Sequence, residues 1–312
     1  MAKKVQDRPA RKVPATFGKK RIHISEGLIS VLILTCALVS VSSLLLVFGF
    51  LLGNASPFFQ SYPPDQFLSG TVWDPFRPGD PTFGILPLFT ATFIISLAAA
   101  VLAVPIGLGC SIYLSELANP KVKSYLKPVI EVMAGIPSVI LGLFAALILS
   151  QWIAAIFDPD STLNALNGAI ILGIMMIPIQ VTISEEAMNS VPRSLREASY
   201  ALGATKWETI RRVVVPSALS GIIASIVLAL GRAIGETMAV LMATGNAPQF
   251  TFDLLRSMQT MTAALANEIP EAASGSIQFQ GLFAVGLVLF IFTFAVNSIA
   301  DVVLARYREA YR

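Results

Sequence analysis

The chain has 312 residues, of which 55% are hydrophobic and only 13% are charged, and its formal net charge is +3. A soluble domain carries roughly a quarter charged residues, so this composition excludes an ordinary soluble globular protein. The small positive charge comes from a few basic segments and does not indicate nucleic-acid binding. We therefore expect an all-α, polytopic membrane protein in contact with the lipid bilayer.

The first 24 residues form a basic tail in front of an apolar run. The tail is rich in Lys and Arg and poor in apolar side chains, so we expect it to build no core of its own. The run after it, over about 28–52, is much longer than the roughly 7–15 apolar residues of a signal peptide. A retained first span is therefore favoured over a cleaved leader.

Six apolar runs are long enough to cross a bilayer, which takes about 20 residues. They lie at about 28–52, 85–115, 129–150, 167–187, 217–244 and 281–305. The sequence divides into a basic tail (1–24), a first span with a long loop (25–84), a core of five spans (85–305) and a short C-terminal end (306–312). The connections 53–84 and 245–280 are expected on the outer side, as contact surfaces for a partner or as plain connections.

The basic residues predict the orientation. All Lys and Arg except Arg77, Arg232 and Arg256 fall in the tail, in two loops on one side, or in the C-terminal end. Loops rich in Lys and Arg stay in the cytoplasm. Both termini are therefore expected to be cytoplasmic.

The residues that commonly build disulfides or metal sites are scarce. Cys36 and Cys110 both lie in expected spans, and His23 is the single histidine. We expect no disulfide framework, no metal site, no cofactor and no catalytic centre.

Three expected spans contain a proline: Pro105, Pro137 and Pro178. Proline lacks an N–H and leaves the carbonyl four residues earlier without its usual donor, so we expect a bend at each position.

The polar loop over 193–216 is expected to form two short helices. Ser194 with Glu197, and Thr205 with Glu208, fit the spacing of capping boxes. In such a box the hydroxyl accepts from the first turn, and the carboxylate reaches back to the N-cap amide. Two starts this close together indicate a helical hairpin.

Gly203 lies where the first of these helices must stop, a position that favours a left-handed backbone. Pro216 is expected to separate the second helix from the next span. Each helix has an apolar face, so the hairpin suits insertion into a groove on another protein. The alternative is an interfacial helix lying on the membrane.

The run Glu197-Ala198-Ser199, with Gly203 six residues after the glutamate and Val213-Val214-Val215-Pro216 beyond it, resembles the EAA signature of ATP-binding-cassette importer permeases. Ser199 replaces an alanine of that signature, and Val213 and Val215 replace isoleucine and leucine. The resemblance implies a coupling surface that sits in a cleft of a separate ATPase, made by Glu197, Ala198, Ser199, Gly203 and Pro216. No Walker sequence occurs, so nucleotide must bind to another subunit and this chain is expected not to be an enzyme.

Arg232 and Glu236 lie inside the fifth expected span, four residues apart, and we therefore expect them on one helical face. A charge at mid-membrane is costly and normally faces a bundle interior or water. The pair is either structural or part of an anion pathway, since the planar fork of Arg suits phosphate oxygens. Gly231 and Gly235 flank the charges in a pattern that permits close helix approach.

Over about 85–305 the chain resembles the PstC family of phosphate-specific importer permeases. Four stretches carry the resemblance: 231–240, Gly245-Asn246, 134–139 and 194–203. The resemblance implies a type I importer fold in a bacterial inner membrane, alternating access, and phosphate as substrate. It also implies a PstA-like second permease, two PstB-like ATPases and a PstS-like periplasmic binding protein. By the same resemblance, Arg232 and Glu236 match charged positions that matter for phosphate passage.

Two alternatives remain at this point. A permease of the same family could carry another oxyanion, and a stand-alone channel or ion-coupled transporter would work without ATP.

Overall fold

The computed structural model describes residues 22–309, with side chains described for 27–299 and 302. The basic tail up to residue 21 and the last three residues lie outside the described residues, so the expectations for both ends rest on the sequence alone. The chain forms two units, 1–49 and 50–312. The described part of the first unit is the beginning of α1 (Ile22–Ser61), an apolar helix long enough to cross a membrane.

The second unit begins with the last turns of α1 and holds all the other elements. They are α2 (Pro64–Ser69), β1 (Trp73–Asp74), β2 (Thr82–Phe83), α3 (Leu86–Ile112), η1 (Tyr113–Leu117), α4 (Pro120–Ala134), α5 (Ser138–Phe144), η2 (Ala145–Leu149), α6 (Ser150–Phe157), α7 (Ala165–Asn189), α8 (Arg193–Ala201), α9 (Lys206–Thr209), η3 (Ile210–Val214), α10 (Val215–Ser217), α11 (Leu219–Ile234), α12 (Met238–Ala243), α13 (Met261–Glu268) and α14 (Ile277–Glu309). The three η segments are π-helical turns between α-helices.

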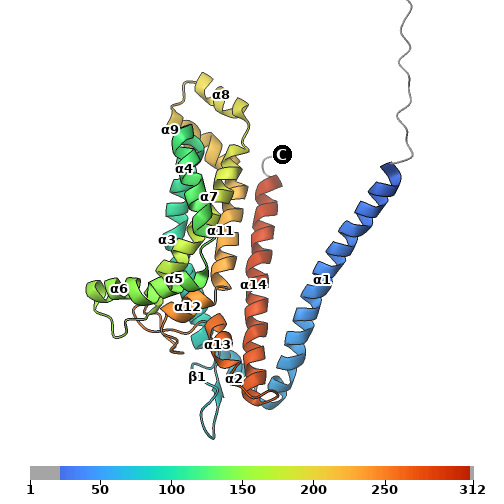
Figure 1. The fold of residues 1–312 in the computed structure, drawn as a ribbon, viewed down its shortest axis with the longest axis vertical. Helices are drawn as coiled ribbons and strands as arrows, with labels where there is room; N and C mark the ends of the chain where they lie inside the picture. Colours follow the sequence, from blue (N-terminus) through green and yellow to red (C-terminus); the bar gives the residue numbers. More distant parts are fainter. Residues whose placement is uncertain (1–21, 310–312) are drawn as a thin grey trace, which may run out of the picture. The chain divides into compact units, whose positions relative to one another are not determined.

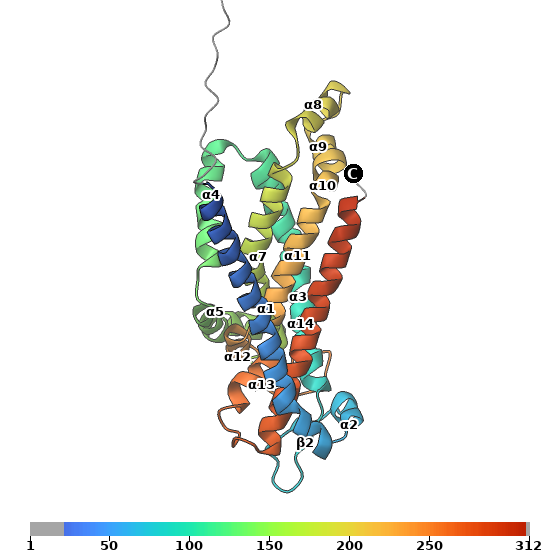
Figure 2. The same ribbon diagram turned by 90° about the vertical axis from the view of Figure 1, so that its right-hand side faces the viewer.

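Four long helices run side by side in this unit. α3 packs along α7, and α11 packs against α7, α3 and α14 (Figures 1 and 2). α8 and α9 lie at one end of the bundle, here called the α8 end. The short antiparallel hairpin of β1 and β2 lies at the other end, here called the β-hairpin end. The all-α prediction is confirmed.

Small residues bring the central helices close together. A Cβ on Gly173 of α7 would lie 3.3 Å from the Ala99 carbonyl of α3, and one on Gly221 of α11 would lie 2.3 Å from Ala187 Cβ of α7. Helices in a bilayer gain little from apolar burial against each other, so close packing through small residues has to hold them together. The core they enclose includes Ile95, Ala103, Ala169, Leu172, Met176, Ala229 and Ala233.

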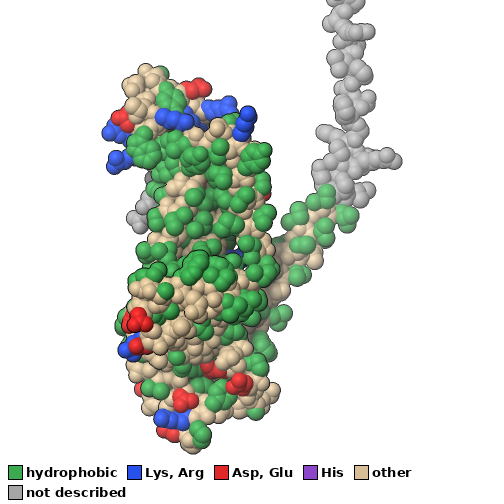
Figure 3. All heavy atoms as spheres, turned by 60° about the vertical axis from the view of Figure 1, so that its left-hand side comes forward, with side chains coloured by type: hydrophobic (Ala, Val, Ile, Leu, Met, Phe, Trp, Pro, Cys, Tyr) green, Lys and Arg blue, Asp and Glu red, His purple; other side chains and the backbone are tan. Residues whose placement is uncertain are grey.

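Within the described residues, five helices are long and apolar enough to cross a membrane, or six if the bent pair Lys206–Ser217 and Leu219–Ile234 counts as one span. The predicted number of spans equals the higher count, but the bounds of two of them differ. Figure 3 shows hydrophobic side chains over the middle of one face and Lys and Arg gathered at the α8 end. Such a distribution is typical of a multi-pass membrane protein.

The third expected span, 129–150, is wrong in its bounds. The chain breaks at Gly135, and Pro137 becomes the N-cap of α5 rather than a bend inside one helix. The carbonyl of Met133, expected to lack a donor, accepts from the Ile136 amide at 3.3 Å. Glycine followed two residues later by proline stops a helix, because proline restricts the residue before it to extended backbone. The apolar stretch of α5, η2 and α6 then runs crosswise to the long helices and extends to one side of them (Figure 1).

The fifth expected span, 217–244, is also broken. α11 ends with Gly235 as its C-cap, and α12 follows after a short turn. Glu236 lies in this turn, where its side chain accepts from the Ala239 amide at 3.3 Å and its carbonyl accepts from Thr262 Oγ1 at 2.8 Å. Polar partners of this kind allow a helix to break within a membrane protein.

Pro105 and Pro178 lie inside α3 and α7, as expected. A buried polar side chain joins the two helices near them: Gln180 Nε2 donates to the Val104 carbonyl at 3.1 Å. Gly107 leaves room for this amide, since a Cβ there would lie 2.8 Å from Gln180 Cδ. This contact was not predicted from the sequence.

At the β-hairpin end an aromatic cluster gives the loop after α1 a core of its own. Phe58 packs against Tyr62, Phe67 and Phe83 with ring centroids 5.1–5.3 Å apart. Trp73 adds an edge contact to Phe83. Aromatic rings bury large apolar areas and prefer edge-to-face geometry, so the loop is a built structure.

The backbones of Gly70 and Gly84 meet in this cluster. A Cβ on Gly84 would lie 2.4 Å from the Gly70 carbonyl carbon. We expect Gly84→Ala to destabilise the β-hairpin end by about 1–3 kcal/mol, because the backbones of residues 70 and 84 must move apart. Limited proteolysis of the purified protein should then cut within residues 62–85. Gly53→Ala, which places its Cβ in open space, is the matched control and should leave the protein resistant.

A buried carboxyl joins the β-hairpin to α13. Glu268 is 7% exposed and accepts from Trp73 Nε1 at 3.0 Å and from Gln259 Nε2 at 2.8 Å. Burial disfavours the charged form and raises the pKa of Glu268 above its ordinary 4.5, although both hydrogen bonds act in the opposite direction.

Because the folded state holds this proton more tightly than the unfolded state, the contribution of Glu268 to stability is fully present below about pH 4.5 and is lost as the pH rises through the folded pKa. Glu268→Gln mimics the protonated acid and should flatten this fall. The measurement is Tm between about pH 4 and pH 7, with an expected difference of about 2–4 °C. Equal slopes for the two proteins would contradict the assignment.

Candidate functional site

The predicted helical hairpin is present at the α8 end. α8 starts after Pro192, and Gly203, with φ +83°, turns the chain towards α9. Leu195 and Leu202 leave 44% and 90% of their surface exposed. An uncovered apolar face on a projecting helix suits docking into a groove.

The turn into α9 is firmly held. The side chains of Thr205 and Glu208 form the predicted capping box, in which the Thr205 amide donates to Glu208 at 2.9 Å. Ser199 and Thr209 share a hydrogen bond of 2.9 Å between α8 and α9. α8 and α9 are therefore joined both through the turn and side by side.

Two details of the hairpin prediction are wrong. Ser194 does not cap α8, since Pro192 occupies the N-cap and no side chain caps this helix. Pro216 does not end the second helix, which continues to Ser217, and the 68° bend into α11 comes at Ala218. Proline is tolerated in the first turn of a helix, so Pro216 fits inside α10 without ending the helix.

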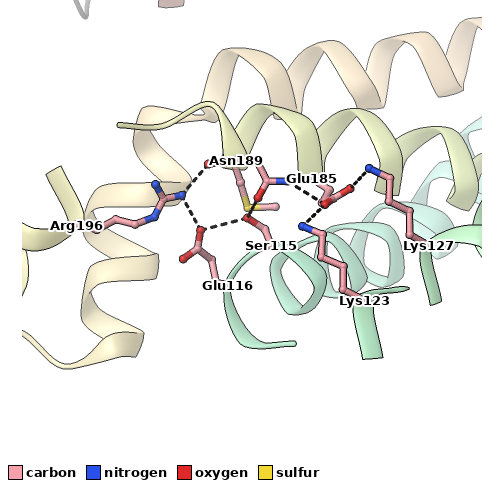
Figure 4. A network of polar contacts seen from close by, with 8 residues as sticks. Ser115, Glu116, Lys123, Lys127, Glu185, Asn189 and Arg196 are labelled. Carbon is pink, nitrogen blue, oxygen red and sulfur yellow. Dashed lines mark hydrogen bonds and ion pairs between the residues drawn. The ribbon is translucent and has the colours of Figure 1, made fainter. Parts of the chain in front are cut away.

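A polar network joins the helical hairpin of α8 and α9 to the bundle (Figure 4). Most of it was not predicted from the sequence. Arg196 of α8 forms an ion pair with Glu116 of η1 at 2.8 Å. Glu185 of α7 forms ion pairs with Lys123 and Lys127 of α4 at 2.6 and 3.0 Å. Pairing of Glu185 with nearby basic residues follows from its place at a span end. The pair of Arg196 with Glu116 joins residues far apart in the sequence and has no local signal.

The network also fixes the charge of Lys127. Its hydrogen bond to the Glu185 carboxylate raises the pKa of Lys127 above its ordinary 10.5. The amine therefore stays protonated at neutral pH.

Arg232 and Glu236 are not a helical pair. Arg232 lies in the last turn of α11, and Glu236 lies beyond the helix end, where it binds the α12 amide of Ala239. Among the described residues, no ion pair involves Arg232. The guanidinium is exposed and lines two small recesses, one next to Glu236 and one with Ile136 at the break between α4 and α5.

The two glycines beside Arg232 differ in role. A Cβ on Gly231 would lie 3.1 Å from Asn297 Oδ1, so Gly231 permits the close contact of α11 with α14. Gly235 has no neighbour this close and serves as the C-cap of α11. Both glycines were predicted to serve helix packing or a kink: Gly231 lies at a close helix contact, and Gly235 lies at the break that ends α11.

Among the described residues, no group of three or more His, Cys, Asp or Glu side chains is placed to hold a metal ion. Cys36 and Cys110 are unpaired thiols.

A bundle of membrane helices that projects a helical hairpin at one end is the arrangement that the resemblance to the membrane components of ATP-binding-cassette importers implies. Residues 103–309 match the family model of the binding-protein-dependent transport system inner membrane component. The chain belongs to this family.

Two curated relatives extend the match. The probable ABC transporter permease protein YqgH of Bacillus subtilis is 33% identical over 94% of this chain and 98% of its own length. The phosphate transport system permease protein PstC of Mesorhizobium japonicum is 35% identical over 77% of this chain and 78% of its own length.

Solved structures share the fold. A bacterial ABC transporter involved in alginate import aligns with a TM-score of 0.61 at 14% identity, covering 91% of this chain and 99% of that one. The inward-facing MetNI methionine transporter aligns with a TM-score of 0.56 at 19% identity, covering 70% and 93%. The type I importer fold is confirmed. The chain is a multi-pass membrane permease subunit that works with ATPase and binding-protein partners.

Proposed function

We propose that this chain is the phosphate-conducting permease subunit of an ATP-driven importer. The observation that carries the proposal is Arg232, an exposed guanidinium without an ion-pair partner among the described residues, in the last turn of α11 before the helix break. An unpaired charge in a membrane protein is expensive unless it faces water or a ligand. Its planar set of donors matches phosphate oxygens, and the named relative in Mesorhizobium japonicum is a phosphate permease.

The surroundings of Arg232 support a pathway role. Its two recesses are lined by residues of α7, α11 and the α4–α5 break, including Met175 and Ile179. Apolar walls strengthen the attraction between a cation and an anion that passes it. Glu236, held at the α12 N-terminus, places a negative charge beside the path and favours release of the anion.

The coupling role belongs to the hairpin 193–216. Its predicted contact residues with the ATPase are Glu197, Ala198, Ser199, Gly203 and Pro216. The side chains of Glu197 and Ala198 are exposed, as docking requires. ATP closes the ATPase dimer, the hairpin moves with it, the bundle opens outwards to accept phosphate, and hydrolysis resets it.

The remaining parts of the assembly follow from this proposal. A PstA-like permease completes the pathway, and two PstB-like subunits hydrolyse ATP. A PstS-like protein delivers phosphate at the β-hairpin end, opposite α8. Both termini then lie in the cytoplasm of a bacterial inner membrane, on the same side as α8. Residues 1–24 form a cytoplasmic tail, 25–84 the first span and its periplasmic loop, 85–305 the permease core and 306–312 the cytoplasmic end.

The test is reconstitution of the full complex in liposomes and measurement of labelled phosphate uptake with and without ATP, with excess sulfate as competitor. We expect ATP-dependent uptake that sulfate leaves unchanged. Uptake lost to sulfate would assign the chain to another oxyanion, and uptake indifferent to ATP would contradict ATP coupling through the hairpin.

A further inference from the structure

α8 projects beyond the bundle and has few contacts with it. Along Arg193–Ala201 the side chains are exposed except those of Arg196 and Ser199. Ser199 binds Thr209 within the hairpin. Arg196 is thus the α8 side chain that binds the bundle.

Arg196 reaches the ends of two bundle helices at once. Its Nη2 donates to Glu116 Oε1 and to the Met188 carbonyl, both at 2.8 Å, and its Nη1 donates to the Val191 carbonyl. Glu116 belongs to η1 at the end of α3, and Met188 lies in the last turn of α7. The C-terminus of a helix carries partial negative charge, so both helix ends stabilise the positive charge of Arg196.

This contact is shielded from water. The side chains of Arg196 and Glu116 are 17% and 7% exposed. Partly buried, charge-assisted hydrogen bonds are stronger and less screened by salt than surface pairs. Arginine also presents several donors in a rigid fork, which lysine cannot reproduce.

The contact continues into a third helix. Ser115 Oγ lies 3.1 Å from Glu116 Oε1 and 3.3 Å from Asn189 Oδ1, so its single proton is shared between these two acceptors. Asn189 in turn donates to Glu185 at 2.9 Å. Glu185, which is 1% exposed, holds both lysines of α4 (Figure 4). One chain of polar contacts therefore runs from α8 through α3 and α7 to α4.

We propose that Arg196 is a positioning residue that makes α8 and the adjoining ends of α3, α7 and α4 move as one body. A displacement of α8 by the ATPase then reaches the bundle directly and is not absorbed at the turns on either side of the hairpin. The inference rests on the proposed ATPase docking at α8 and does not depend on which anion is carried.

The first test compares uptake per ATP hydrolysed in the reconstituted complex for Arg196→Gln, Glu116→Gln and the double variant. We expect each single variant to lose about tenfold, as for loss of a partly buried charge-assisted contact, with the ATPase still bound. The double variant should lose no more than either single one, because both remove the same contact. Arg196→Lys should recover part of the loss. Lys121→Gln, an exposed cation of α4, is the control and should match the wild type.

Unchanged uptake per ATP in Arg196→Gln, or fully additive losses in the double variant, would overturn the role of Arg196. Absence of phosphate uptake in the wild type would overturn the substrate assignment instead.

A second test needs no substrate. Spin labels at Arg193→Cys on α8 and Tyr125→Cys on α4, with the exposed Cys36 and Cys110 replaced by serine, report the distance between the two helices. In the wild-type complex we expect one narrow distance distribution that ATP leaves unchanged, and in Arg196→Gln a broad one that shifts with ATP. A wild-type distance that shifts as much as the variant would overturn the proposal.

Discussion

Arg232→Gln should lower ATP-driven phosphate uptake by roughly a hundredfold or more while the complex still assembles. Arg232 is exposed in this structure, and the estimate applies to the state in which passing phosphate displaces water from it. Removing one member of such a desolvated charge pair typically costs about 2–5 kcal/mol. Because Arg232 has no ion-pair partner among the described residues, its loss leaves no buried carboxylate unpaired within this part of the chain. Stability should therefore change little. The measurement is labelled phosphate uptake together with co-purification of the ATPase.

Two further variants sharpen this result. Arg232→Lys keeps the charge but not the planar fork and should give intermediate uptake. Arg256→Gln removes a cation from an exposed pair with Asp253 and should leave uptake at the wild-type level. Normal uptake in Arg232→Gln would exclude a pathway role, and loss of the assembled complex would assign Arg232 a structural role.

Gly203→Val should leave a complex in which ATP hydrolysis and transport are uncoupled, with uptake reduced at least about tenfold. Gly203 has φ +83°, and a Cβ at this position would meet no atom within 4 Å, so the effect of valine comes from the backbone and not from a clash. A β-branched residue with positive φ costs about 1–3 kcal/mol. The chain relieves this cost by reshaping the turn, which changes the angle between α8 and α9.

Gly275→Val is the matched control. Gly275 has φ +80° and equally open surroundings, but it lies between α13 and α14, away from the hairpin. The same backbone strain there should leave uptake per ATP unchanged. If both variants lose coupling equally, general instability and not hairpin geometry is the cause. Normal coupling in Gly203→Val would exclude docking through this turn.

The sequence determined those features of this protein that depend on neighbouring residues. Long apolar runs predict membrane helices because the bilayer thickness sets their length. The capping box of Thr205 with Glu208 and the left-handed turn at Gly203 were predicted from local spacing, since both are built within a few residues. The hairpin was therefore foreseeable.

Helix ends within apolar runs were harder to place. Apolar residues resume after the breaks at Gly135 and Gly235, so hydropathy predicted single spans where the chain turns. In the turn after Gly235, Thr262 donates to the Glu236 carbonyl, and this partner follows later in the chain. The expectation that Arg232 and Glu236 share one helical face was wrong, because it assumed an unbroken helix.

Membership of an importer-permease family and the existence of the helical hairpin 193–216 could thus be inferred from the sequence, because the family resemblance is carried by local motifs and the hairpin by local spacing. Only the tertiary structure placed Arg232 without an ion-pair partner among the described residues and joined Arg196 to Glu116, which lie 80 positions apart in the sequence. A contact of this kind exists once α3, α7 and α8 have packed together. Short-range spacing carries no information about it, since its geometry is set by helix packing and not by the residues next to either partner.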